Sequence, residues 1–164
     1  KRQPEYDIIF DDDDANEASD IIAIKGYESE HNKLIFELYH CKFSSKNEPG
    51  GRLKDLYEVC GQAQRSYHWR HNAMELLNHM NRRNSTRLIQ GNPTRIEKGG
   101  DDELLVIQNM LLSNYCDIEF HIYVVQLGIE KNKLSNNSEL LSLLGATDLL
   151  LKRTGNESFI ITNE

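Results

Sequence analysis

The chain has few cysteines and no long apolar run. Its three cysteines, Cys41, Cys60 and Cys116, include no CxxC pair. An odd cysteine count without that spacing argues against a disulfide framework and a structural zinc site, and it favours a reducing, cytoplasmic setting. The chain contains no stretch of about 18 apolar residues, and its first residues carry no apolar signal segment. The sequence therefore predicts a cytoplasmic protein without a membrane partner.

The length and composition are those of a globular domain. The chain has 164 residues, of which 38% are hydrophobic and 27% charged. This length can bury a core without disulfides or metals. Residues 1–13 are polar and acidic, so we expect an acidic leader or linker there and a single domain over residues 14–164. Because the sequence does not begin with Met, we also expect a piece excised from a larger multidomain protein.

Charge is unevenly distributed along the chain, although the net charge is −7. Residues 1–20 contain eight acidic and two basic residues, whereas residues 42–99 contain eleven basic and five acidic residues. A basic segment can bind phosphate locally while the whole protein stays acidic and soluble. A solvated helix face would give the same pattern.

Hydrophobic periodicity predicts alternating strands and helices. Asp14 is placed to cap a short helical turn over residues 15–19. We expect strands over residues 20–24, 33–43, 118–127 and 158–162, with a short one at 87–89, and helices over 52–82 (one or two), 101–114 and 138–153. The first two strands are expected to form a hairpin. This order indicates an α/β fold, a mixed or parallel β-sheet flanked by helices.

Asp20 and Lys42 are the residues most suggestive of chemistry. Side chains alternate along a strand, so His40 and Lys42 share one face at the end of the second strand. In an antiparallel hairpin, the start of the first strand lies beside that end. Asp20 and Lys42 are therefore expected to be neighbours, with Glu17 as a second carboxylate. Glu37 is an alternative carboxylate, but its position in the strand places it on the opposite face.

This residue set suits metal-assisted cleavage of a phosphodiester. Carboxylates bind Mg²⁺, which polarises a phosphate and lowers the pKa of a bound water. A lysine can orient or deprotonate that water and offset negative charge. A lysine that ends an apolar strand is also an ordinary surface residue with a buried stem.

An aspartate on one strand and an x-Lys motif at the end of the next, followed by a helix, resembles the PD-(D/E)XK nuclease superfamily, in particular its Mrr-type branch. The resemblance implies a restriction-endonuclease-like core and a Mg²⁺- or Mn²⁺-dependent endonuclease acting on DNA. It also implies a restriction or phage-defence setting, and a homodimer for cutting both strands. Some branches carry a glutamine on the following helix, the place that Gln62 occupies. The catalytic residues would be Asp20, His40, Lys42 and Gln62.

One position departs from that family. His40 stands where Asp or Glu is usual, and a histidine nitrogen suits Mg²⁺ less well than a carboxylate. The ligands would be Glu17, Asp20 and His40 with the Cys41 carbonyl, or Glu17 and Asp20 with that carbonyl if His40 does not bind. A catalytically inactive, nuclease-like module for binding DNA or docking a protein is the alternative.

Three arginines follow the presumed catalytic strand and are candidates for binding substrate. Arg52, Arg65 and Arg70 could each place a guanidinium against a phosphate of the DNA. Ordinary exposed arginines would give the same sequence.

Overall fold

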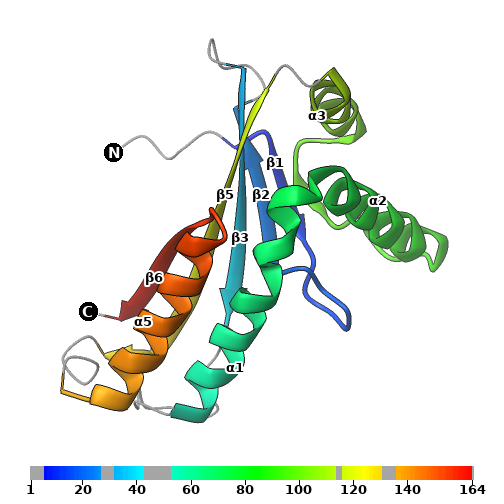
Figure 1. The fold of residues 1–164 in the computed structure, drawn as a ribbon. Helices are drawn as coiled ribbons and strands as arrows, with labels where there is room; N and C mark the ends of the chain where they lie inside the picture. The colour runs from blue at the N-terminus through cyan, green and yellow to red at the C-terminus, as the bar shows by residue number, and fades with distance from the viewer. Residues whose placement is uncertain (1–5, 27–31, 43–52, 114–115, 131–135, 164) are drawn as a thin grey trace. The chain divides into compact units, whose positions relative to one another are not determined.

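The structure is a computed structural model, which describes residues 6–26, 32–42, 53–113, 116–130 and 136–163. Three strands come first, three helical segments follow, and strands and helices alternate thereafter (Figure 1). In chain order, the elements are β1 (Ile8–Asp11), β2 (Ile21–Lys25), β3 (Lys33–Cys41), α1 (Leu53–Arg65), the 3₁₀ helix η1 (Ser66–His71), α2 (Ala73–Ile89), β4 (Ile96–Lys98), α3 (Asp101–Ser113), β5 (Asp117–Glu130), α5 (Ser138–Arg153) and β6 (Glu157–Asn163).

The strands form a six-stranded mixed sheet in the order β4-β1-β2-β3-β5-β6. β1 runs antiparallel to both β2 and β4, and β5 runs parallel to β6. The predicted α/β class with a mixed sheet flanked by helices is confirmed. Among the described residues, no helix has both the length and the apolar character needed to cross a membrane.

The end of β2 lies beside the start of β3. Gly26 has a φ of +106°, and a Cβ there would collide with the backbone carbonyl of Lys33. Gly26 thus allows a close approach that another residue would obstruct. Because the end of one strand meets the start of the next, these neighbouring strands run antiparallel, as the expected hairpin requires. Residues 27–31, which connect them, lie outside the described residues.

β1 is a strand that the sequence analysis missed. Residues 1–13 were expected to be a leader or linker, yet Ile8–Asp11 pair with β2 and β4. Ile8 and Phe10 are completely buried, so this segment contributes to the core. The strand has only four residues, and the run of four aspartates that begins with its last residue concealed it.

Two further local predictions were wrong. Residues 15–19 do not form a helical turn, because Asn16 has a left-handed φ of +65° and the chain turns there instead. Residues 87–89 are the last turn of α2 rather than a strand. Gly91, at φ +78°, donates from its N–H to the Leu88 carbonyl at 2.9 Å and ends the helix. The predicted helix over residues 52–82 is two helices, α1 and α2, separated by η1.

The chain groups into two compact units. The first lies within Lys1–Leu38 and His68–Phe120, and the second within Tyr39–Tyr67 and His121–Glu164. In the core of the first, Phe36 and Phe120 stack with ring centroids 4.9 Å apart. In the second, α1 and α5 pack together (Figure 1). Gln64 donates to the Thr147 hydroxyl at 2.8 Å.

Candidate functional site

Three carboxylates converge in the connection between β1 and β2, residues 12–20, here called the acidic turn. Asp13, Glu17 and Asp20 each offer one oxygen, and these oxygens all lie within 4.8 Å of one another. Asp13 is exposed, whereas Glu17 and Asp20 are half-buried. Three oxygen ligands at this spacing suit a hard divalent cation such as Mg²⁺. Glu17 and Asp20 were predicted from the sequence as metal ligands, whereas Asp13 was not.

Backbone hydrogen bonds bring these acids together. The Asp12 N–H donates to the Asp20 carbonyl at 3.0 Å, which closes the base of the turn. Within it, the Glu17 N–H donates to the Asp14 carbonyl at 3.2 Å, and the Glu17 carboxylate accepts from the Asp14 N–H at 3.2 Å. Residues three to seven positions apart thus point their carboxylates to one place.

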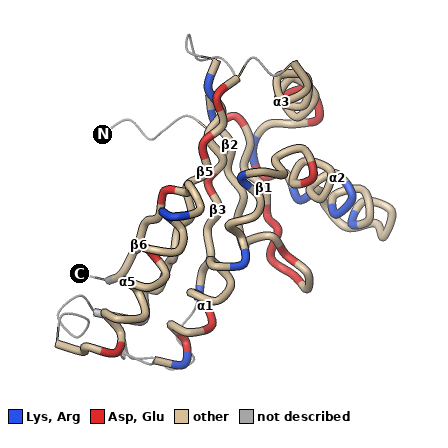
Figure 2. Tube along the Cα trace, in the orientation of Figure 1, with Lys and Arg blue, Asp and Glu red and all other residues tan. Residues whose placement is uncertain are grey.

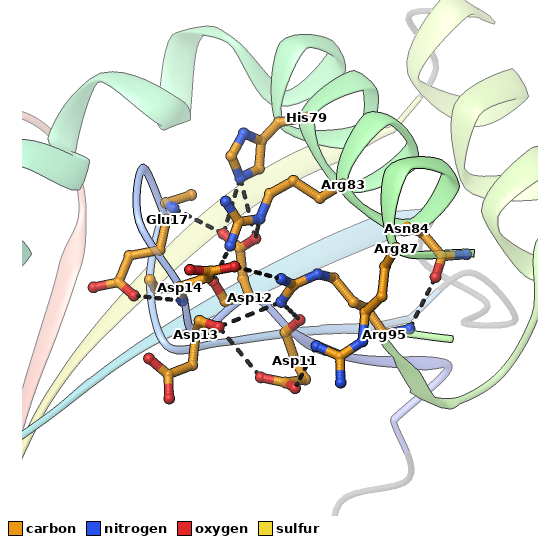
Figure 3. Close-up of polar contacts among 12 residues, drawn as sticks. Asp11, Asp12, Asp13, Asp14, Glu17, His79, Arg83, Asn84, Arg87 and Arg95 are labelled. Atoms are coloured by element: carbon orange, nitrogen blue, oxygen red, sulfur yellow. Dashed lines mark hydrogen bonds and ion pairs between the residues drawn. The ribbon is translucent and has the colours of Figure 1, made fainter. Parts of the chain in front are cut away.

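Asp12 holds the acidic turn against α2. Its side chain is fully buried and accepts a hydrogen bond from the Ala18 N–H at 2.8 Å. His79 Nε2 lies 2.9 Å from Asp12 Oδ2, and Arg83 Nε lies 2.5 Å from Asp12 Oδ1 (Figure 3). The role of Asp12 in holding the turn was not predicted from the sequence. A signal was present, because Asp12 continues the alternation of the buried Ile8 and Phe10.

Like charges within the acidic turn favour protonation or a bound cation. Burial raises the pKa of the Glu17 carboxyl, and the nearby charges of Asp20, Asp13 and Asp12 raise it further, while the hydrogen bond from Asp14 opposes them. Figure 2 shows acidic residues gathered in this turn and basic residues along α2. A divalent cation would relieve the repulsion that raises this pKa.

Lys42, in the second unit, is paired with a carboxylate. Its Nζ lies 2.5 Å from Glu58 Oε1 on α1, and both side chains are partly exposed. The hydrogen bond from Lys42 lowers the pKa of the Glu58 carboxyl. The Lys42 N–H donates to the Val125 carbonyl at 3.0 Å, so β5 fixes the backbone of this residue. The ammonium therefore lies at a defined place at the end of β3.

His40 is a buried, neutral histidine. Burial, with a smaller effect from the Arg65 charge, lowers its pKa to about 4. Its Nε2 lies 2.9 Å from the Ser66 hydroxyl, which donates to the Gln62 carbonyl at 3.4 Å. Because the Ser66 hydroxyl donates to Gln62, its oxygen accepts from His40 Nε2, so Nε2 carries the ring proton and Nδ1 keeps a lone pair. Nδ1 has no hydrogen-bond partner within the part of the chain that the structure describes.

The predicted site residues belong to different parts of the molecule. Glu17, Asp20 and Arg70 lie in the first unit. The second unit contains the others that are described, namely His40, Cys41, Lys42, Gln62 and Arg65. Arg65 is exposed, Arg70, Gln62 and Cys41 are half-buried, and Arg52 lies outside the described residues.

The alternative carboxylate Glu37 has a structural role. Its side chain is almost fully buried, accepts from the Tyr6 hydroxyl at 2.8 Å and pairs with Lys25 at 2.5 Å. Burial with a partner for each oxygen is the arrangement expected of a core carboxylate.

Comparison with known proteins identifies no relative from which a function could be transferred. No protein-family model matches the chain, and neither does any curated protein or any solved structure. The functional assignment therefore depends on the chemistry of the residues described above.

Proposed function

We propose that this chain is a nuclease domain with a restriction-endonuclease-like core, and that it hydrolyses phosphodiester bonds in DNA with a divalent cation. The observation that carries the proposal is the convergence of Asp13, Glu17 and Asp20 in the acidic turn. Acidic groups gather on many protein surfaces without a metal. Here, however, the turn is held by the buried Asp12 and directly precedes β2, the neighbour of β3 in the sheet.

The chain supplies the groups that such a reaction needs. Asp13, Glu17 and Asp20 would hold Mg²⁺ or Mn²⁺, and their all-oxygen donor set fits either ion. When bound, such an ion supplies positive charge and a water of lowered pKa. Lys42 follows β3 directly, and its role as a cation for a phosphate oxygen or an attacking water stays a prediction. That His40, the Cys41 carbonyl and Gln62 also act in the site stays a prediction.

The wider setting is part of the same proposal and derives from the family resemblance. It comprises a larger restriction or phage-defence protein, a cytoplasmic location and a homodimer that cuts both strands. Arg65 and Arg70 are proposed to contact substrate phosphates, as is Arg52.

One observation favours a second function, a nuclease-like module that binds DNA or docks a protein without cutting. Lys42 is paired with Glu58, and His40 stands where the nucleases that the sequence resembles carry an acid. A lysine held by a neighbouring carboxylate has less charge available for a phosphate.

Plasmid cleavage in Mg²⁺ or Mn²⁺ distinguishes the two functions. The intact chain should nick DNA, and the Asp20→Asn and Lys42→Gln variants should each lose at least about tenfold in rate, an effect of about 1.4 kcal/mol on the barrier. Glu97→Gln is the matched control, because Glu97 is an exposed acid on β4. Metal-independent nicking, or full activity in both variants, would reject the nuclease assignment. DNA binding without cleavage would establish the second function.

A further inference from the structure

A cavity of about 280 Å³ lies in the first unit, beside the acidic turn. Four arginines line it: Arg82, Arg83 and Arg87 on α2, and Arg95 just before β4. Arg83 and Arg87 are separated by four residues, the spacing that places side chains on one helix face, and Arg82 directly precedes Arg83. Asp14, next to the metal-site candidate Asp13, also lines the cavity. We call this cavity the arginine pocket.

Three of the four arginines of this pocket, Arg83, Arg87 and Arg95, are held in position by polar contacts. Arg83 donates to the Asp12 carbonyl at 2.8 Å (Figure 3). It also donates to the Ala15 carbonyl at 2.8 Å, and Arg87 donates to the Pro93 carbonyl at 3.0 Å. Arg95 donates to the Asp11 carbonyl at 2.9 Å and lies 3.2 Å from the Asp14 carboxylate. Guanidinium groups positioned in this way lose little conformational entropy when they bind an anion.

The charge of the pocket fits a singly charged anion. Three of its arginines contact a carboxylate each: Arg83 with Asp12, Arg95 with Asp14 and, at 4.0 Å, Arg87 with Asp11. Arg82, exposed on α2, adds a fourth guanidinium. The three ion pairs are neutral, so the four arginines and these three aspartates together carry one excess positive charge, that of Arg82. A phosphodiester carries one negative charge, whereas a terminal phosphate carries up to two.

Arg95 gives a second, independent indication of a ligand. It is only 6% exposed, and its Nε–H, a buried donor, has no hydrogen-bond acceptor among the described residues. A buried donor without an acceptor is costly, and such groups call for a specific explanation. Arg95 therefore brings to the pocket a guanidinium whose donors its described neighbours do not fully satisfy.

We propose that the arginine pocket binds one phosphodiester group of a nucleic-acid strand. This inference rests on the proposed nuclease function and deepens it. The arginines would hold the strand beside Asp14, one residue from Asp13, so a neighbouring phosphate of the same strand would lie near the acidic turn and any cation bound there. The cavity is slightly smaller than typical small-molecule sites, and it suits part of a polymer better than a whole nucleotide.

The test is DNA binding measured without cleavage. Fluorescence anisotropy of a short labelled DNA duplex is recorded in EDTA for the whole chain and for Arg82→Glu, Arg82→Gln and Arg82→Lys. Arg82 is exposed, so these changes should leave the fold intact, which thermal unfolding verifies. Arg153→Gln, at the end of α5 in the other unit, is the matched control.

We expect Arg82→Glu to weaken binding about tenfold and Arg82→Gln to lower the slope of log K against log salt by about one, as loss of one phosphate contact does. Arg82→Lys should keep most of the affinity. Equal affinities for all variants, or no DNA binding by the whole chain, would overturn the proposal. So would displacement of the duplex by a mononucleotide at equal phosphate concentration. Because this assay contains no metal, its failure is distinct from failure of the cleavage assay.

Discussion

Arg83 Nε lies 2.5 Å from Asp12 Oδ1, and this ion pair joins the middle of α2 to the acidic turn. The carboxylate is fully buried, and the arginine side chain is 15% exposed. His79 and the Ala18 N–H occupy the other Asp12 oxygen. A buried carboxylate with a partner for each oxygen is stable only while these partners remain, because removing one leaves a charge without compensation. The position of the proposed metal ligands thus depends on α2.

We expect Asp12→Asn to destabilise the protein strongly. The substitution leaves Arg83 and His79 facing a neutral amide, and breaking a buried ion pair typically costs about 3 to 5 kcal/mol. Urea unfolding measures the change in the free energy of unfolding. Asp13→Asn, one residue away and exposed, should change it by less than about 0.5 kcal/mol. Equal losses in the two variants would mean that the pair with Arg83 does not support the turn.

Asp13 tests whether the acidic turn binds a metal. Asp13→Asn removes one of three converging carboxylates, and we expect the affinity for Mn²⁺, measured by calorimetry or paramagnetic relaxation, to fall at least about tenfold. This prediction can be checked without any substrate. Asp101→Asn, an exposed acid in the first turn of α3, is the control. Unchanged Mn²⁺ affinity in Asp13→Asn would remove this carboxylate from the proposed site.

The long apolar segments could be predicted from the sequence, whereas the acidic turn could not. β3, β5 and α5 have regular apolar patterns and were found nearly within their bounds. β1 has four residues, ends in an aspartate and precedes three more, so local composition concealed it. The burial of Asp12 depends on Arg83 and His79, about seventy positions away, and no local pattern shows such a contact. The pairing of Lys42 with Glu58 likewise arises only when α1 packs beside the end of β3.

Glu58 is expected to restrain Lys42. Glu58→Gln removes the charge that holds the ammonium, so the rate of DNA cleavage should rise about two- to fivefold if Lys42 acts on the phosphate. Stability should change by less than about 1 kcal/mol, because exposed ion pairs contribute little. Asp55→Asn on the same helix is the control. A loss of activity in Glu58→Gln as large as in Lys42→Gln would show instead that the pair acts as a unit.

His40 should make stability depend on pH in the mildly acidic range. Its pKa in the folded protein is about 4, against an ordinary value of 6.5, so the unfolded chain takes up a proton that the folded protein does not. The stabilising contribution is therefore present above pH 6.5 and is lost as the pH falls toward 4. A shift of this size corresponds to roughly 3 kcal/mol. Urea unfolding at several pH values measures it.

The His40→Gln variant isolates this contribution. Other groups titrate in both proteins, so the difference between the two stability curves reports His40 alone. The difference in unfolding free energy between the wild-type protein and His40→Gln should be largest at neutral pH. It should narrow between pH 6.5 and 4, because the wild-type protein loses the stabilising contribution of neutral His40 there. His71→Gln, at an exposed position in η1, should keep the wild-type slope. A constant gap across this range would mean that His40 is not held neutral by burial beside Ser66.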